Sequence, residues 1–250
     1  MNRTFVWGHR GAGFSGIQNS ITSFQKAIEM GVDGIKTEAQ LSKDNEIFLT
    51  FQQNLNLNDT SIPINKLNKD KIKKFKLKNG ESIPTLPELF KTFRNHEIRY
   101  NFDISAPEIG IRIIEIAREF NMLDKIEIAK TSIDSSPLLK IFSKIREFDK
   151  NVKLNNSVFL KYSNIKEKHL ELESMTDLNV GCINVNYNIA NFELFKLVVS
   201  KGYTFCVWGL LFNRSMEKFL KMNYQGRYID AMMSNFPDRL VRLRNKIQNN

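Results

Sequence analysis

The chain of 250 residues is 42% hydrophobic and 26% charged, which is typical of a globular protein with a core of useful size. Its two cysteines, Cys182 and Cys206, exclude a disulfide framework and a cysteine-rich metal cluster, and their apolar neighbours favour buried free thiols. No apolar run is long enough to cross a bilayer, and polar residues recur from Asn2 to Arg10. These features predict a cytoplasmic protein, and the formal net charge of +10 would attract anionic ligands.

Strand-like and helix-like patterns alternate along the chain. The first strand is expected at 4–9 and the first helix at 19–30, and the second strand follows Gly31 at 32–41. The second major helix opens at Thr85-Leu86-Pro87-Glu88, which has the pattern of a capping box with an early proline. The remaining strands and helices are expected in pairs at 98–104 and 107–120, 126–131 and 134–145, 152–160 and 166–176, 181–186 and 190–201, 203–208 and 213–222, and 228–233 and 236–247.

This alternation predicts a parallel sheet with helices between its strands. Eight strand–helix units in 250 residues match a closed (β/α)8 TIM barrel. A doubly wound open sheet is the alternative, but no glycine-rich dinucleotide-binding fingerprint follows any strand. The glycines of Gly8-His9-Arg10-Gly11-Ala12-Gly13 have the wrong spacing for that fingerprint. We therefore expect one barrel domain over 1–250.

A polar, lysine-rich stretch after the second strand predicts a loop insertion at 53–82, beside or over the mouth of the barrel, with a short helix at 69–76. Seven lysines lie between Lys66 and Lys78. No nucleic-acid-binding motif accompanies them, so we expect a solvated face and no specific nucleic-acid partner. Peripheral contact with an anionic membrane stays open, and the oligomeric state is not specified by the sequence.

Polar side chains gather where the predicted strands end. The carboxyl ends of barrel strands carry the chemistry of TIM-barrel enzymes, so one shared pocket is expected there. The alternative is that these residues only mark where strands meet solvent. The residues are His9, Arg10, Lys36, Glu38, Gln40, Asn101, Asp103, Ser105, Lys130, Ser132, Asn184, Asn186, Trp208, Ser234 and Asn235.

Several ordered motifs resemble those of the glycerophosphodiester phosphodiesterases, which are (β/α)-barrel hydrolases. The resemblance runs nearly from end to end of the chain. It is carried by Gly8-His9-Arg10-Gly11, Gln18-Asn19-Ser20, Gly31-Val32-Asp33-Gly34-Ile35, Leu41-Ser42-Lys43-Asp44, Ile83-Pro84-Thr85-Leu86-Pro87-Glu88, Val207-Trp208, Asp230-Ala231-Met232 and Phe236-Pro237-Asp238-Arg239-Leu240.

The resemblance implies a divalent metal, calcium or magnesium, which carboxylates of the second and third strands hold beside the phosphodiester. It also implies two histidines that act as general acid and base. Carried over residue by residue, the catalytic group is His9 and the metal ligands are Glu38 and Asp103. The residues expected to bind substrate are Arg10, Asn19, Lys36 and Trp208.

This chain departs from the family pattern at functional positions. Lys36-Thr37-Glu38 stands where the family has Glu-x-Asp, Asp103 where it has glutamate, and Phe51-Gln52 where it has His-Asp. The second catalytic histidine is therefore missing. His96 and His169 are expected at the opposite end of the barrel and on the outer helix ring, where neither can replace it.

These departures predict weak metal binding and slow hydrolysis. The Lys36 ammonium could pair with Glu38 and Asp103 and still face a phosphate. Two functions stay open for a pocket that takes a small-molecule phosphodiester. One is a phosphodiesterase of phospholipid and glycerol metabolism with impaired activity. The other is a catalytically silent protein that binds a phosphorylated ligand or a partner protein.

Overall fold

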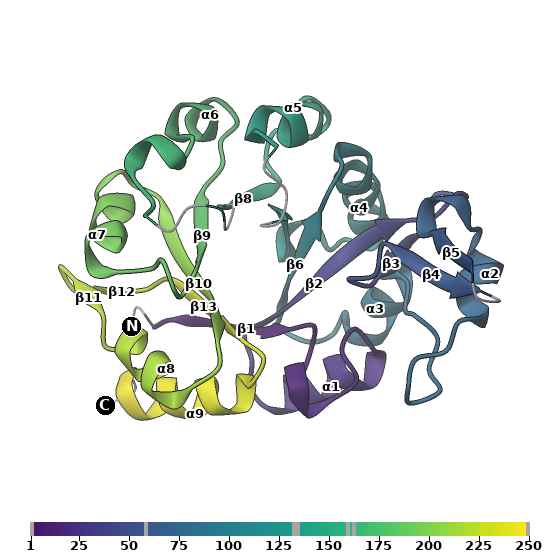
Figure 1. Cartoon of the computed structure of the whole chain (residues 1–250), viewed down its shortest axis with the longest axis horizontal. Coiled ribbons are helices and arrows are strands. Elements are labelled where there is room, and N and C mark those ends of the chain that lie inside the picture. Colours follow the sequence, from purple (N-terminus) through teal and green to yellow (C-terminus); the bar gives the residue numbers. More distant parts are fainter. Residues whose placement is uncertain (1–2, 58–59, 132–135, 159–160, 162–163, 249–250) are drawn as a thin grey trace.

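The computed structural model describes residues 3–57, 60–131, 136–158, 161 and 164–248. Its centre is a closed barrel of eight parallel strands (Figure 1). β1 pairs with both β13 and β2, and this double pairing closes the barrel. The barrel strands are β1 (Phe5–His9), β2 (Gly34–Leu41), β6 (Arg99–Ile104), β7 (Ile126–Lys130), β8 (Lys153–Ser157), β9 (Cys182–Asn186), β10 (Thr204–Leu210) and β13 (Ala231–Ser234).

In the described part of the chain, each barrel strand is followed by one α-helix that packs around the barrel, and β2 is followed by an additional short helix before it (Figure 1). The predicted (β/α)8 TIM barrel is therefore confirmed. The eight helices are α1 (Ile21–Glu29), α3 (Leu86–Phe93), α4 (Pro107–Glu119), α5 (Leu138–Phe148), α6 (Leu172–Asp177), α7 (Phe192–Ser200), α8 (Asn213–Leu220) and α9 (Pro237–Gln248).

The main apolar core lies between the barrel strands and the helices. On β6, Tyr100 and Phe102 are fully buried against Phe90 of α3. The residues that alternate with them, Asn101 and Asp103, belong to the opposite, inward face of the strand because strand side chains alternate. The inside of the barrel is thus largely polar at the level of the site, while hydrophobic burial outside it holds the strands in place.

Local signals set the helix starts. The capping box predicted at Thr85 is present: the Glu88 backbone N–H donates to Thr85 Oγ1, and the Thr85 backbone N–H donates to the Glu88 carboxylate at 2.8 Å. Ser20 caps α1 by accepting from the backbone N–H of Ser23. These contacts satisfy backbone donors that have no partner within the first helical turn.

Some predicted boundaries differ from the structure. The strand expected at 152–160 ends at Ser157 within the described residues, and 159–160 lies outside them. The helix expected at 134–145 begins at Leu138, and part of the expected range lies outside the described residues.

Between α8 and the last barrel strand lies a hairpin that the sequence patterns did not predict. The last barrel strand begins at Ala231 rather than at position 228, because β11 (Asn223–Tyr224) and β12 (Arg227–Tyr228) precede it. Gln225 and Gly226 both have positive φ at its turn, which suits the turn of a two-residue hairpin.

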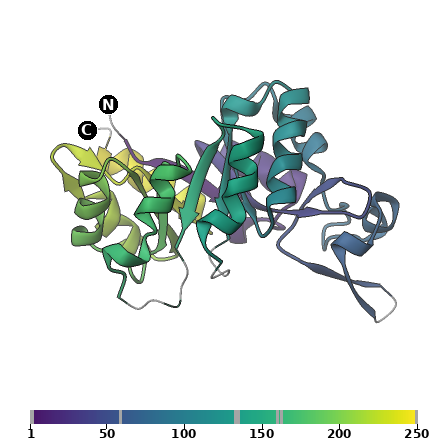
Figure 2. The same cartoon turned by 90° about the horizontal axis from the view of Figure 1, so that it is seen from above.

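The stretch after β2 builds a small unit at the side of the barrel. β3 (Ile47–Leu49) pairs antiparallel with β2, and β4 (Asn54–Leu57) and β5 (Thr60–Pro63) form a hairpin that projects outward (Figure 2). The short helix α2 (Lys69–Lys74) completes it. A separate apolar cluster holds the unit together, made of Phe48, Leu55, Ile64, Leu67, Ile72 and Ile83. Among the described residues, no helix has the length and apolarity needed to cross a bilayer.

Candidate active site

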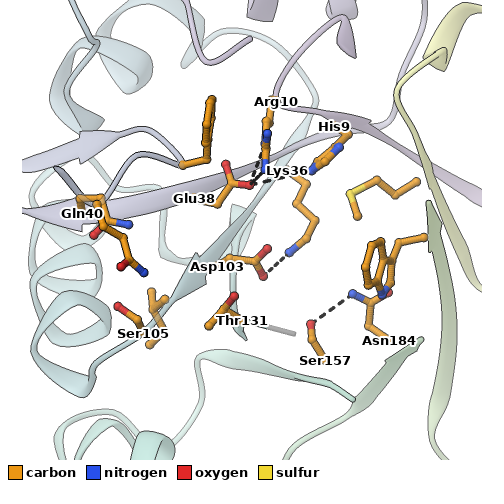
Figure 3. A pocket seen from close by; sticks show the side chains of 15 residues that line it. His9, Arg10, Lys36, Glu38, Gln40, Asp103, Ser105, Thr131, Ser157 and Asn184 are labelled. Carbon is orange, nitrogen blue, oxygen red and sulfur yellow. Dashed lines mark hydrogen bonds and ion pairs between the residues drawn. The ribbon is translucent and has the colours of Figure 1, made fainter. Parts of the chain in front are cut away.

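The polar side chains at the carboxyl ends of the strands surround one cavity of about 310 Å³ (Figure 3). Six of the seven residues expected to act in catalysis, substrate binding or metal binding line it, and these are His9, Arg10, Lys36, Glu38, Asp103 and Trp208. The seventh, Asn19, is buried, donates to Glu38 at 3.2 Å and accepts from Thr37 at 2.8 Å. The contacts of Asn19 therefore orient Glu38. A direct contact between Asn19 and the substrate stays a prediction.

His9 ends β1, and a hydrogen bond fixes its imidazole. Its Nδ1 lies 2.6 Å from the side-chain oxygen of Asn235, so Nδ1 carries the proton and Nε2 has the lone pair. Nε2 lies 3.9 Å from the Glu38 carboxylate. Burial lowers the pKa of His9 to about 4, although Glu38 opposes this shift. The imidazole is therefore neutral at pH 7 and can accept a proton at Nε2.

Arg10 is bound to Glu38. Its Nε and a terminal nitrogen both contact one Glu38 carboxylate oxygen, at 2.8 and 2.6 Å, and its other terminal nitrogen donates to Gln18 at 3.1 Å. Its guanidinium lies 4.4 Å from the centre of the Phe51 ring. The guanidinium therefore borders the cavity, and several of its N–H groups already have hydrogen-bond partners.

Lys36 places an ammonium inside the barrel. Its side chain is 5% exposed, and its Nζ donates to Asp103 at 2.5 Å and to Asn101 at 2.7 Å. Burial raises the pKa of Asp103, while the nearby Lys36 charge opposes that rise. Lys36 was expected to pair with both Glu38 and Asp103; it pairs with Asp103, and Arg10 takes Glu38.

Asn101 links Lys36 to a deeper carboxylate. Its side-chain N–H donates to Glu127 at 3.1 Å, which turns its oxygen toward Lys36. Glu127 also accepts from Asn155 at 2.7 Å and pairs with Arg99. A continuous polar chain thus runs down the barrel from the cavity.

The sequence pattern of the glycerophosphoryl diester phosphodiesterase family matches residues 9–239. The chain belongs to this family. A glycerophosphodiester phosphodiesterase of Caldanaerobacter subterraneus is 28% identical over 141 residues, which are 51% of this chain and 58% of the relative. Human lysophospholipase D is 22% identical over 127 residues, 45% of this chain and 40% of that protein. These matches thus span about half the length of the curated relatives.

Solved structures show the same fold over nearly the full length. A putative glycerophosphodiester phosphodiesterase from Galdieria sulphuraria superposes with a TM-score of 0.82 at 19% identity, covering 97% of this chain and 98% of the other. A phosphodiesterase from Oleispira antarctica, solved with the product sn-glycerol-3-phosphate, superposes with a TM-score of 0.80 at 15% identity, covering 96% of both chains.

The residues at the family's metal position do not fit a divalent cation in this arrangement. Glu38 and Asp103 each already have a cationic partner, Arg10 and Lys36, and Lys36 also takes the Asn101 oxygen. Among the described residues, no group of three or more His, Cys, Asp or Glu side chains is placed to hold a metal ion. A metal such as calcium prefers six to eight oxygen ligands. It would have to displace the Lys36 ammonium before it could reach Asp103.

Phe51, which stands where the resemblance led us to expect the family's second histidine, is 49% exposed and lines the cavity. Of the three histidines, all of them in the described part of the chain, His9 alone lines the cavity. The backbone N–H of His96 donates to Phe93 before β6, and His169 lies in a 3-10 turn where it accepts from Lys166. Both therefore belong to other parts of the fold.

Some cavity residues were not singled out from the sequence. Thr131, Ser157, Gln53 and Met233 line it, and Asn184 donates to Ser157 at 3.2 Å. Ser157 could have been predicted to line the cavity from its position at the end of β8, because the other barrel strands also contribute residues near their carboxyl ends to the cavity. Ser132, which was expected at the end of β7, lies outside the described residues.

Proposed function

We propose that this barrel binds a glycerophosphodiester, or the glycerol phosphate headgroup of one, and hydrolyses it slowly or not at all. The observation that carries the proposal is the ammonium of Lys36, held 2.5 Å from Asp103 in the wall of the cavity. It supplies a fixed positive charge at the position where the family's active members use a metal. The charge binds an anion without supplying the chemistry of a divalent ion.

The phosphate would lie between Lys36 and Arg10, the two cationic side chains of the cavity lining. Both side chains attract a phosphate oxygen. The imidazole of His9 is neutral, so it neither attracts nor repels the phosphate through a net charge. Trp208 lines the cavity, and its indole N–H is buried without a hydrogen-bond partner among the described residues. The Oleispira antarctica relative with bound sn-glycerol-3-phosphate supports this ligand class.

Hydrolysis needs a base that activates water and an acid that protonates the leaving alkoxide. His9 can accept a proton at Nε2, but Phe51 has no proton to give to the leaving group. A missing general acid or base costs about 10²–10⁴-fold in rate. Loss of the metal removes several further kcal/mol of charge stabilisation in the transition state.

A working phosphodiesterase is the second candidate, and the presence of His9 in the cavity, with Nε2 able to accept a proton, favours it. In that case Lys36 itself neutralises the phosphate. A role in phospholipid and glycerol metabolism follows from either candidate. The free cysteines suit a reducing compartment, which supports the cytoplasmic location proposed from the sequence.

The test is titration calorimetry with glycerophosphocholine and sn-glycerol-3-phosphate, with and without calcium or magnesium, beside a product assay. We expect binding that does not depend on metal, and turnover well below about 1 s⁻¹. Lys36→Gln should abolish binding. Lys91→Gln, which removes an exposed lysine on α3, is the matched control and should bind normally.

Turnover at an ordinary enzyme rate without added calcium or magnesium would establish the second candidate instead. No binding of either compound would refute both, and would leave the partner-protein alternative.

A further inference from the structure

The two cysteines of this chain meet inside the barrel at the end opposite the phosphate cavity. Cys182 lies on β9 and Cys206 on the neighbouring β10, and their Sγ atoms are 2.8 Å apart. Both thiols are free. Buried free thiols in apolar runs were expected from the sequence. The register of the two strands brings them together: Cys206 pairs with Asn184, two residues beyond Cys182.

Both cysteines line a second cavity, of about 380 Å³, formed at the amino ends of the strands. Phe5, Arg99 and Thr204, which each begin a barrel strand, line the same cavity. A small oxidant can therefore reach the sulfurs.

We propose that Cys182 and Cys206 are a redox pair that forms a reversible disulfide within one chain when the protein meets peroxide. The Sγ atoms need to approach only from 2.8 Å to the bonded distance of about 2.0 Å. Neighbouring barrel strands are already held by their backbone hydrogen bonds, so the bond forms without a rearrangement of the fold. This inference does not depend on the proposed function.

The chemistry balances with peroxide as the oxidant. One thiolate attacks a peroxide oxygen, which gives a sulfenic acid and one molecule of water or hydroxide. The second thiol attacks the sulfenic sulfur, forms the S–S bond and releases the hydroxyl as a second water. The two sulfurs are oxidised and peroxide is reduced, and a dithiol reverses the bond by exchange.

The surroundings of the two thiols make their oxidation slow, so we expect it only at the peroxide concentrations of oxidative stress. Contact with the Cys182 thiol and burial raise the pKa of Cys206, and the carboxylates of Glu127 and Asp230 raise it further. Arg99 and Lys153 are the cationic residues that line the same cavity. A protonated thiol reacts slowly, so the pair should stay reduced under ordinary reducing conditions.

The cross-link would join the strands that carry two residues of the phosphate cavity. Asn184 lies two positions after Cys182 and Trp208 two positions after Cys206, so each pair shares the inward face of its strand. Because the sulfurs move so little, the cavity should keep its shape. The bond should instead hold β9 and β10 together and oppose unfolding.

The test uses the reduced full-length protein, titrated with hydrogen peroxide, alkylated under denaturing conditions and measured by mass spectrometry. We expect a monomer that has lost two hydrogen atoms, takes up no alkylating agent and yields a peptide pair joining Cys182 to Cys206. Tm should rise by about 5–10 °C and return on reduction with dithiothreitol. Cys182→Ser and Cys206→Ser are the controls, which should form no internal cross-link and gain no stability.

The mass measurement on the unaltered chain stands even if a serine variant folds poorly. Two alkylated cysteines after peroxide, or a covalent dimer in place of the internal bond, would overturn the proposal. An internal bond that leaves Tm unchanged would overturn the claim that it holds the two strands together.

Discussion

The Lys36 ammonium and the Asp103 carboxylate form a contact of 2.5 Å inside the barrel, between neighbouring strands β2 and β6. Register explains the contact: Lys36 lies opposite Asn101, and Glu38 lies opposite Asp103, so all four side chains share the inward face. Lys36 then binds both residues of the partner strand. The pair has a direct consequence for metal binding, because the Lys36 ammonium takes the Asp103 oxygen that a metal would need.

The first prediction concerns Lys36→Glu and Phe51→His, separately and together. Lys36→Glu removes the ammonium and adds a carboxylate beside Glu38 and Asp103, so calcium affinity should rise in calorimetry. Phe51→His adds a second proton carrier. Both act on one transition state, so the turnover gain of the double variant should exceed the product of the single gains, and reach about 10²-fold or more.

Phe148→His is the matched control, because Phe148 is an exposed phenylalanine on α5. It should change neither metal affinity nor turnover. A double variant that gains no more than the singles would contradict the interpretation of these two positions.

The second prediction is that Glu127→Gln destabilises the fold and weakens phosphate binding. Glu127 accepts from Asn101 and Asn155 and pairs with Arg99. Without its charge, Arg99 loses its partner and Asn101 loses its orientation toward Lys36. Urea unfolding should show a loss of about 1–3 kcal/mol. Glu97→Gln, at a 94% exposed side chain, is the control and should change stability little.

The third prediction concerns pH. The pKa of His9 is about 4 in the fold against 6.5 for a free histidine, so the unfolded chain binds more protons between these values. The neutral imidazole of His9 therefore contributes fully to the free energy of unfolding above pH 6.5, and this contribution is lost as pH falls toward 4. The loss should approach roughly 3 kcal/mol. Urea unfolding between pH 7.5 and about 4 measures it.

His9→Gln supplies the comparison, because it removes the titration while keeping a polar side chain. The difference in unfolding free energy between the two proteins should vary with pH across that window. A difference that stays constant with pH would show that folding does not shift the pKa of His9, and would contradict the prediction.

The fourth prediction concerns the unit at 53–82, which we expect to be cut first in limited proteolysis. Its apolar cluster is separate from the main core, and Ile72 is fully buried in it. Ile72→Ala should therefore speed cleavage in this stretch without changing unfolding of the barrel. Ile113→Ala, in the main core, should destabilise the barrel by about 2–5 kcal/mol. Equal effects of the two changes on barrel unfolding would contradict this separation.

The sequence alone was enough to predict the barrel and to place the candidate site at the carboxyl ends of its strands. Hydrophobic alternation and helix caps are local signals, and the Thr85 capping box appears in the structure as predicted. His9, Lys36 and Asp103 could be placed in one pocket because the carboxyl ends of parallel strands meet. Phe51 and Lys36 could also be singled out from the sequence, because the resemblance places them where the family's second histidine and a metal-binding carboxylate are expected.

Only the tertiary structure decided which charges pair. Lys36 could have bound Glu38, but Arg10 takes that carboxylate and leaves Lys36 to Asp103 and Asn101. The contact between Cys182 and Cys206 likewise depends on how two strands align, which no local pattern encodes. The physical reason is the same in both cases. Secondary structure follows from neighbours along the chain, whereas these partners are chosen by strand register and by burial in a shared interior.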